Sequence, residues 1–216
     1  MNNYKIVFMG TPDFGIPSLN ELYKQGYEVE AVYTQPDRVN KRGNKVQFSA
    51  VKQFALEHDI TIYQPNSLKD EKELDVLRAL NPDLIIVIAY GKILPQAVLD
   101  IPKYGVINVH ASLLPKYRGA APVQRSIIDG EETTGVTIMQ LDAGMDTGNI
   151  IAEKSVFITP HMTSEDLFDV LSNVGAKLLI DVLDDLPAKL AASVKQDESK
   201  ATYAEKLTKE MGHINW

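Results

Sequence analysis

The sequence contains no cysteine among its 216 residues. Disulfide bonds and thiolate catalysis are therefore excluded, and the composition fits a reducing compartment. No apolar run approaches the roughly 18 residues that a membrane-spanning helix needs. The apolar run at residues 6–9 is too short for the core of a secretory signal. We therefore expect a cytoplasmic protein without membrane contact.

Positive charge is also scarce. Lysine and arginine number 22 against 29 acidic residues, which gives a net charge of −7. This balance argues against a broadly basic nucleic-acid-binding surface. A local basic stretch remains at residues 35–45, where the cations are Arg38, Lys41, Arg42 and Lys45. Such a stretch is either a solvated loop or a flexible arm that contacts phosphate, and its charge alone leaves both interpretations open.

The sequence lacks the glycine pattern G-x-G-x-x-G of dinucleotide-binding proteins. Gly10 and Gly15 stand alone with Pro12 between them, which indicates a tight turn from a strand into a helix. Apolar strands at residues 5–10 and 29–34 enclose this turn and a helical pattern. A strand–helix–strand opening predicts the α/β class, with a doubly wound, mostly parallel, Rossmann-like sheet.

The most apolar segment, residues 84–89, predicts the central strand of that sheet. Tyr90 and Gly91 follow it, at the edge where open α/β sheets bind ligands. Backbone groups at this point are placed to recognise a planar heterocycle. An ordinary strand-to-loop turn explains the same residues equally well.

Residues 105–122 hold the most informative pattern in the chain. Val106, Ile107 and Val109 predict a buried strand, and polar Asn108 and His110 interrupt it at a spacing of two. Residues two apart in a strand project to the same side. The pattern therefore predicts that an amide and an imidazole point into one cavity.

A third polar candidate, Asp146, lies in a glycine-rich loop at residues 142–148. Acyl transfer to an amine needs a base, a neutral donor for the oxyanion and a carboxylate that supports the imidazolium. His110, Asn108 and Asp146 can supply these in that order, although a strand Asn and His can also be purely structural. No serine or lysine nucleophile is evident, which favours direct attack by the amine. No metal is expected, because the zinc pattern H-E-x-x-H and cysteine are both absent.

At these residues the sequence resembles the folate-dependent formyltransferases. The segments that carry the resemblance are residues 8–14, 34–38, 107–115, 117–122, 134–139, 146–148 and 202–206. Within the family, the Arg-Gly-Ala-Ala-Pro segment at 118–122 and the Gln-Pro-Asp-Arg segment at 35–38 are similar to the branch that acts on initiator tRNA. Residues 39–41 depart from the family, since Val-Asn-Lys stands where Pro-Ala-Gly is common.

The resemblance implies a Rossmann-like formyltransferase fold. It also implies that 10-formyltetrahydrofolate is the co-substrate and that the amino group of initiator methionyl-tRNA accepts the formyl group. Asn108, His110 and Asp146 match the family's catalytic residues. The positions matching its folate site are Ser112, Leu113, Leu114, Pro115, Ile88, Ala89, Tyr90, Leu141, Asp142 and Gly144. The positions matching its arm at the tRNA acceptor end are Arg38, Lys41, Arg42 and Lys45, with Arg42 as the principal contact.

The resemblance further implies a catalytic domain over residues 1–190. Residues 191–216 are then a tail or linker towards a C-terminal β-barrel domain that this chain lacks. We therefore expect a monomer with intact chemistry and a reduced affinity for tRNA, since phosphate contacts set much of that affinity. Two alternatives remain. One is a formyltransferase acting on another amine, such as an amino sugar nucleotide. The other is a 10-formyltetrahydrofolate hydrolase or folate-binding module.

Overall fold

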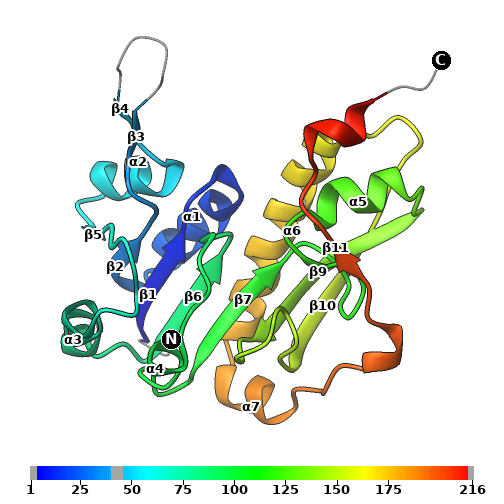
Figure 1. Ribbon diagram of the computed structural model, residues 1–216. Helices are drawn as coiled ribbons and strands as arrows, with labels where there is room; N and C mark the ends of the chain where they lie inside the picture. The colour runs from blue at the N-terminus through cyan, green and yellow to red at the C-terminus, as the bar shows by residue number, and fades with distance from the viewer. Residues whose placement is uncertain (1–3, 40–45, 214–216) are drawn as a thin grey trace.

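A computed structural model of the chain describes residues 4–39 and 46–213 (Figure 1). Its centre is a seven-stranded sheet. In spatial order the strands are β10 (Ile150–Phe157), β9 (Thr133–Gln140), β7 (Val106–His110), β6 (Leu84–Ile88), β1 (Lys5–Gly10), β2 (Glu28–Tyr33) and β5 (Thr61–Tyr63). The pairs from β5 to β7 are parallel, whereas β9 and β10 run antiparallel to their neighbours. The predicted doubly wound, mostly parallel α/β sheet is confirmed.

The order of the strands determines which edge of the sheet can bind a ligand. From β1 the chain builds outward through β2 and β5, then returns to the other side of β1 with β6 and β7. A parallel sheet that reverses its winding direction leaves a crevice at the carboxyl ends of the strands flanking the reversal. The reversal lies between β1 and β6, next to β7.

Helices cover both faces of the sheet (Figure 1). One face packs against α1 (Ile16–Lys24), α2 (Ala50–Glu57), α5 (Pro122–Ile128) and α6 (Ser164–Leu183), and the other against α3 (Glu71–Leu80) and α4 (Gln96–Leu99). Consecutive strand residues alternate between the two cores, as Phe8 and Met9 do. Because both faces are buried, the strands read as continuous apolar runs.

Helix α6 packs against β7 on one face of the sheet. Thr163 begins the helix with a reciprocal cap, in which its Oγ1 accepts from the N–H of Asp166 and its own N–H donates to the Asp166 carboxylate. Gly175 lets the helix approach the sheet closely, since a Cβ there would lie 2.8 Å from Cγ1 of Val109. The strand that carries Asn108 and His110 therefore rests directly on α6.

The polar stretch after β2 is more ordered at its base than the predicted loop. β3 (Arg38–Val39) pairs antiparallel with β4 (Val46–Gln47), which makes a hairpin stem. Just before the stem, the carboxylate of Asp37 accepts hydrogen bonds from Lys52 Nζ at 2.5 Å and from Gln64 Nε2 at 2.8 Å. Of the four cations predicted to contact tRNA, only Arg38 is described, and it is exposed. Lys41, Arg42 and Lys45 lie outside the described residues.

After α7 (Leu186–Ala191) the chain passes the start of β10 and returns to β8. Val194 forms an isolated antiparallel bridge with Ile150, and β11 (Tyr203–Ala204) pairs in parallel with β8 (Arg118–Gly119). We call residues 194–204 the strap. The short 3₁₀ turns are η1 (Asp13–Gly15), η2 (Glu198–Lys200) and η3 (Lys209–Gly212). None of the helices in residues 4–39 and 46–213 combines the length and the apolar character needed to cross a bilayer.

Candidate active site

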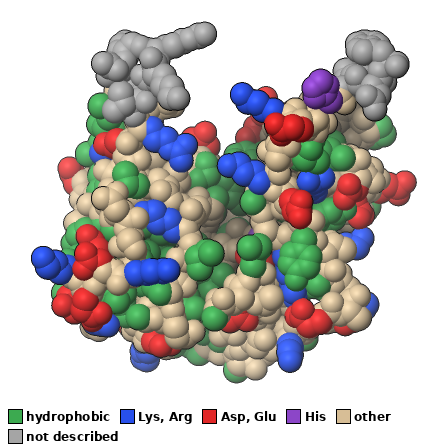
Figure 2. Space-filling view, viewed as in Figure 1, with side chains coloured by type: hydrophobic (Ala, Val, Ile, Leu, Met, Phe, Trp, Pro, Cys, Tyr) green, Lys and Arg blue, Asp and Glu red, His purple; other side chains and the backbone are tan. Residues whose placement is uncertain are grey.

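A cavity of about 670 Å³ opens at the carboxyl ends of β6 and β7. Figure 2 shows the surface hollowed at the centre of this face. Eight of the residues predicted for the site line the cavity: Asn108, His110, Asp146, Ala89, Tyr90, Leu141, Asp142 and Gly144. The remaining lining is mostly apolar and includes Phe14, Ile93 and Phe168. Its volume is that of a typical small-molecule site, which ranges from about 300 to 1,000 Å³.

Asn108 and His110 both face this cavity from β7. Their neighbours Ile107 and Val109 pack in the core on the opposite face, as the two-residue period of a strand requires, and Val109 also borders the cavity. The Asn108 side chain is 9% exposed and makes no hydrogen bond with any described residue. A buried amide usually has a partner in the protein. The Asn108 amide is therefore available to hydrogen-bond a bound molecule.

The orientation of the His110 ring is set by the backbone of Tyr117. His110 Nε2 lies 2.9 Å from the Tyr117 carbonyl oxygen, and this contact is buried. A carbonyl oxygen only accepts, so Nε2 must carry the proton in this hydrogen bond. In the neutral ring the lone pair is then on Nδ1. His110 is thus prepared to accept a proton at Nδ1.

Asp146 stands beside that nitrogen. Its Oδ2 lies 3.8 Å from His110 Nδ1 and accepts a hydrogen bond from the N–H of Gly119 at 2.8 Å. The distance to Nδ1 is too long for a hydrogen bond but short enough to stabilise the ring when it is protonated. The Asp146 backbone has φ of 54°, in the left-handed region that non-glycine residues seldom occupy. Its surroundings must hold it there.

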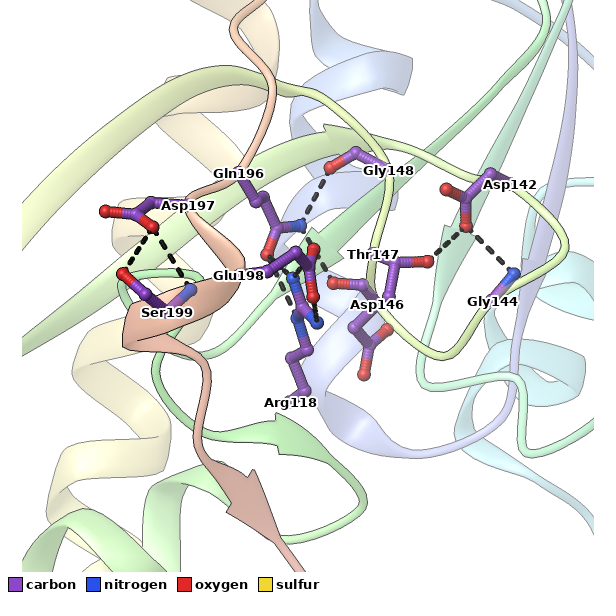
Figure 3. Close-up of polar contacts among 10 residues, drawn as sticks. All are labelled: Arg118, Asp142, Gly144, Asp146, Thr147, Gly148, Gln196, Asp197, Glu198 and Ser199. Atoms are coloured by element: carbon purple, nitrogen blue, oxygen red, sulfur yellow. Dashed lines mark hydrogen bonds and ion pairs between the residues drawn. The ribbon is translucent and has the colours of Figure 1, made fainter.

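The loop that carries Asp146 is closed by its own polar contacts. Asp142 Oδ1 accepts from Thr147 Oγ1 at 2.6 Å and from the N–H of Gly144 at 3.0 Å (Figure 3). Gly148 follows where a Cβ would lie 1.9 Å from the carbonyl oxygen of Gln140, so only glycine fits. Gly148 thus lets the loop pass close to the end of β9.

The turn after β6 forms the opposite wall. The carbonyl oxygen of Tyr90 accepts from Thr11 Oγ1 at 3.1 Å and from Gln35 Nε2 at 3.0 Å. Ala89, the first residue after β6, has a φ of 49°, in the left-handed region that non-glycine residues seldom occupy. The Tyr90 side chain is buried, and burial raises the pKa of its phenol to about 12, which keeps it neutral. Two hydrogen bonds therefore hold the backbone of this wall, and its Tyr90 side chain is neutral.

The other predicted folate residues do not line the cavity. Ser112, Leu113, Leu114 and Pro115 form a turn packed behind it. Ser112 Oγ donates to the carbonyl of Lys116 at 2.6 Å, and the N–H of Leu114 donates to Thr137 Oγ1 at 3.1 Å. The Ile88 side chain is fully buried in the core that contains α1 and α6. A folate contact through these residues stays a prediction.

Within the described residues, no group of three or more histidines and acids is placed to hold a metal ion. The polar groups around His110 are the Tyr117 carbonyl and the Asp146 carboxylate. Sequence reasoning missed the Tyr117 carbonyl and the Gly119 N–H, because backbone partners leave no trace in residue types. It also missed Gln196, which contacts the Asp146 loop from the strap.

Comparisons with known proteins agree with this architecture. A family model described as "Formyl transferase" matches residues 4–183. Two proteins named "Methionyl-tRNA formyltransferase", from Caldanaerobacter subterraneus subsp. tengcongensis and from Clostridium perfringens strain SM101, are each 51% identical to this chain. Each match covers 98% of this chain and 69% of the relative.

Solved structures give the same fold at low identity. The phosphoribosylglycinamide formyltransferase of Streptococcus pneumoniae TIGR4 is 21% identical with a TM-score of 0.68, covering 85% of this chain and 98% of that one. The glycinamide ribonucleotide transformylase 1 of Symbiobacterium toebii is 19% identical with a TM-score of 0.71, covering 90% and 95%. With the family match and the relatives at 51% identity, the chain belongs to the formyl transferase family, on the branch of the methionyl-tRNA formyltransferases.

Proposed function

We propose that this protein transfers the formyl group of 10-formyltetrahydrofolate to the amino group of methionyl-initiator tRNA. The observation that carries the proposal is the meeting of Asn108, His110 and Asp146 at one cavity, with His110 Nδ1 facing the carboxylate. The relatives at 51% identity support tRNA as the acceptor. The cavity also suits the folate, since it is large, mostly apolar and edged by backbone groups at residues 89–91 and 141–144.

The residues divide the chemistry among them. The folate, when bound, supplies an activated formyl carbon. As the amine forms its bond to that carbon, the Asn108 amide is placed to donate to the negative charge that develops on the formyl oxygen. His110 takes the amine proton at Nδ1, and Asp146 stabilises the resulting imidazolium. The same proton then passes from His110 to the departing folate nitrogen as the carbon–nitrogen bond to the folate breaks.

We infer that the hairpin of β3 and β4 approaches the tRNA acceptor end. Arg38 is exposed on its stem, and the predicted contacts Lys41, Arg42 and Lys45 lie outside the described residues. Cations on a short polar arm fit phosphate, because phosphate recognition needs charge and no base-stacking side chain. We also propose that the protein is a cytoplasmic monomer.

The test is formyl transfer from 10-formyltetrahydrofolate to methionyl-initiator tRNA by the 216-residue chain, at saturating tRNA. Parallel reactions contain an amino sugar nucleotide, or no acceptor. Transfer to tRNA at a rate well above the other two is expected. Faster transfer to the amino sugar would favour the second acceptor class. Formate release without acceptor, at a rate equal to transfer, would identify a hydrolase.

The basic arm has its own test. Arg42→Ala is expected to lower kcat/KM for tRNA about tenfold and to leave folate binding unchanged. Arg78→Ala is the matched control, since Arg78 lies half-exposed on α3 and, among the described residues, pairs only with Glu71 and Asp75 of the same helix. If Arg42→Ala weakens folate binding as much as it lowers transfer to tRNA, the hypothesis that this arm contacts tRNA is wrong.

A further inference from the structure

The strap contacts both loops that supply partners to His110. One loop contains Tyr117 and Gly119, and the other contains Asp146. The strap lies beyond residue 183, where the match to the family model ends. Its side chain nearest to Asp146 belongs to Gln196, which is only 4% exposed. A buried amide in a mostly exposed segment indicates a specific role for its hydrogen bonds.

Every hydrogen-bonding position of the Gln196 amide is in use. Nε2 donates to the carbonyl oxygens of Asp146 and Gly148, each at 2.8 Å (Figure 3). Oε1 accepts from Arg118 Nε at 3.1 Å and Nη2 at 2.7 Å. The amide thus connects the turn of the Asp146 loop to the guanidinium of the other loop.

Arg118 fixes which way the Gln196 amide points. Its guanidinium is fully buried and can only donate, so the oxygen of the amide must face it and the nitrogen must face the two carbonyls. The same guanidinium forms a bidentate pair with Glu198, from Nη1 at 2.9 Å and Nη2 at 2.8 Å. Hydrogen bonds from Arg118 hold the pKa of the Glu198 carboxyl below its usual range. Gln196 is therefore braced in a single orientation.

This bracing acts on the residue whose backbone is strained. Asp146 has a left-handed φ of 54°. The carbonyl is held by Gln196, while the carboxylate is held by the N–H of Gly119. Fixing the carbonyl fixes the peptide plane, and the peptide plane sets where the carboxylate can reach.

We propose that Gln196, braced by Arg118, is a positioning residue that holds the Asp146 carboxylate beside His110 Nδ1. The proposal rests on the proposed function for its catalytic consequence. Gln196 does not itself line the cavity, and it reaches the site through its hydrogen bond to the Asp146 carbonyl. The strap is then a part of the catalytic domain and does more than lead out of it.

The test variant is Gln196→Glu. It keeps an oxygen for Arg118 and the size of the side chain, but it removes both donors to the carbonyls of Asp146 and Gly148. We expect kcat for formyl transfer to fall at least tenfold, while KM for 10-formyltetrahydrofolate stays within twofold. Amide hydrogen exchange of residues 142–148 should become faster. Ser199→Ala is the control within the strap, since Ser199 is exposed and its side chain hydrogen-bonds only to Asp197 among residues 4–39 and 46–213. It should leave kcat and exchange unchanged.

A double-mutant cycle separates positioning from general damage. In an Asp146→Asn background, Gln196→Glu should change kcat less than twofold, because the group that it positions is already lost. Equal losses in the two backgrounds would overturn the proposal, and so would unchanged exchange of residues 142–148. If Gln196→Glu does not fold, Glu198→Ala replaces it. That side chain is 61% exposed, and its loss should lower kcat about threefold by releasing Arg118. No change in kcat would again overturn the proposal.

A failure of the proposed function can be distinguished from a failure of the positioning role. A wild-type chain that transfers no formyl group would refute the function, whatever the variants do. Hydrogen exchange of residues 142–148 needs no catalysis, so it still decides whether Gln196 holds the loop.

Discussion

The backbone N–H of Tyr117 donates a hydrogen bond of 2.9 Å to the hydroxyl oxygen of Thr202, which lies 85 residues later in the chain. The carbonyl of the same Tyr117 orients the ring of His110. Tyr117 has a left-handed φ of 60°, so this residue depends on its neighbours to keep its backbone in place. The strap therefore supports His110 through Thr202, as it supports Asp146 through Gln196.

Thr202→Val is expected to destabilise the protein and to slow transfer. Valine keeps the shape of threonine but leaves the N–H of Tyr117, a buried residue, without its acceptor. The free energy of unfolding should fall by about 1 kcal/mol, as for a lost hydrogen bond, and kcat should fall several-fold. Urea unfolding and steady-state transfer measure the two effects. Thr202→Ser keeps the hydroxyl and should retain most of both. Equal behaviour of the two variants would show that the hydroxyl is not the support.

The sequence predicted the parts of the site that follow from local periodicity. Asn108 and His110 share a side because a strand has a two-residue period, and the structure places both on the cavity. The parallel sheet follows from fully apolar segments such as β6, which must be buried on both faces. These features depend only on neighbours in the chain.

The bracing of the site could not be predicted in the same way. Arg118 reads as a surface cation within a basic segment, yet it is fully buried, because Gln196 and Glu198 satisfy it from the strap. β8 and β11 have two residues each, too few for any alternating pattern. Such contacts join residues about 80 positions apart and show no signal in a single sequence.

Asn108→Ala is expected to slow the chemical step and to spare donor binding. The Asn108 amide makes no hydrogen bond with the described residues, so its loss leaves no protein group unpaired. The barrier should rise by about 3–4 kcal/mol, as when other oxyanion donors are removed. Single-turnover transfer and the fluorescence of bound folate measure rate and binding separately. A rate within tenfold of the wild type would contradict the role given to Asn108.

His110→Ala should lower kcat by roughly 10²–10⁴-fold, the usual contribution of a general acid–base. Folate affinity should change little, since the imidazole is proposed to move a proton and not to hold the donor. His161→Ala is the control, because His161 is exposed in the loop before α6. If added imidazole restores transfer to His110→Ala alone, proton transfer is the lost step. Near-normal turnover without it would place the base elsewhere.

Glu131→Gln tests how the other side of Tyr117 is anchored. Glu131 Oε1 accepts from Lys116 Nζ at 3.0 Å and from the Tyr117 hydroxyl at 2.9 Å. These hydrogen bonds, that of Lys116 foremost, hold the pKa of the carboxyl below its usual 4.5. A carboxyl with a lowered pKa in the folded state adds stability above its unfolded pKa and loses it as the pH falls through the folded one.

The wild type should therefore be more stable than Glu131→Gln at pH 7, by about 0.5 kcal/mol because the pair is partly solvated. The difference should shrink below pH 4.5 as the carboxylate of the folded protein is protonated. Urea unfolding of both proteins at pH 7 and pH 3 measures it. Glu132→Gln, at an exposed neighbour, should match the wild type at both values. A gap between Glu131→Gln and the wild type that stays constant from pH 7 to pH 3 would mean that the Glu131 charge does not anchor Tyr117.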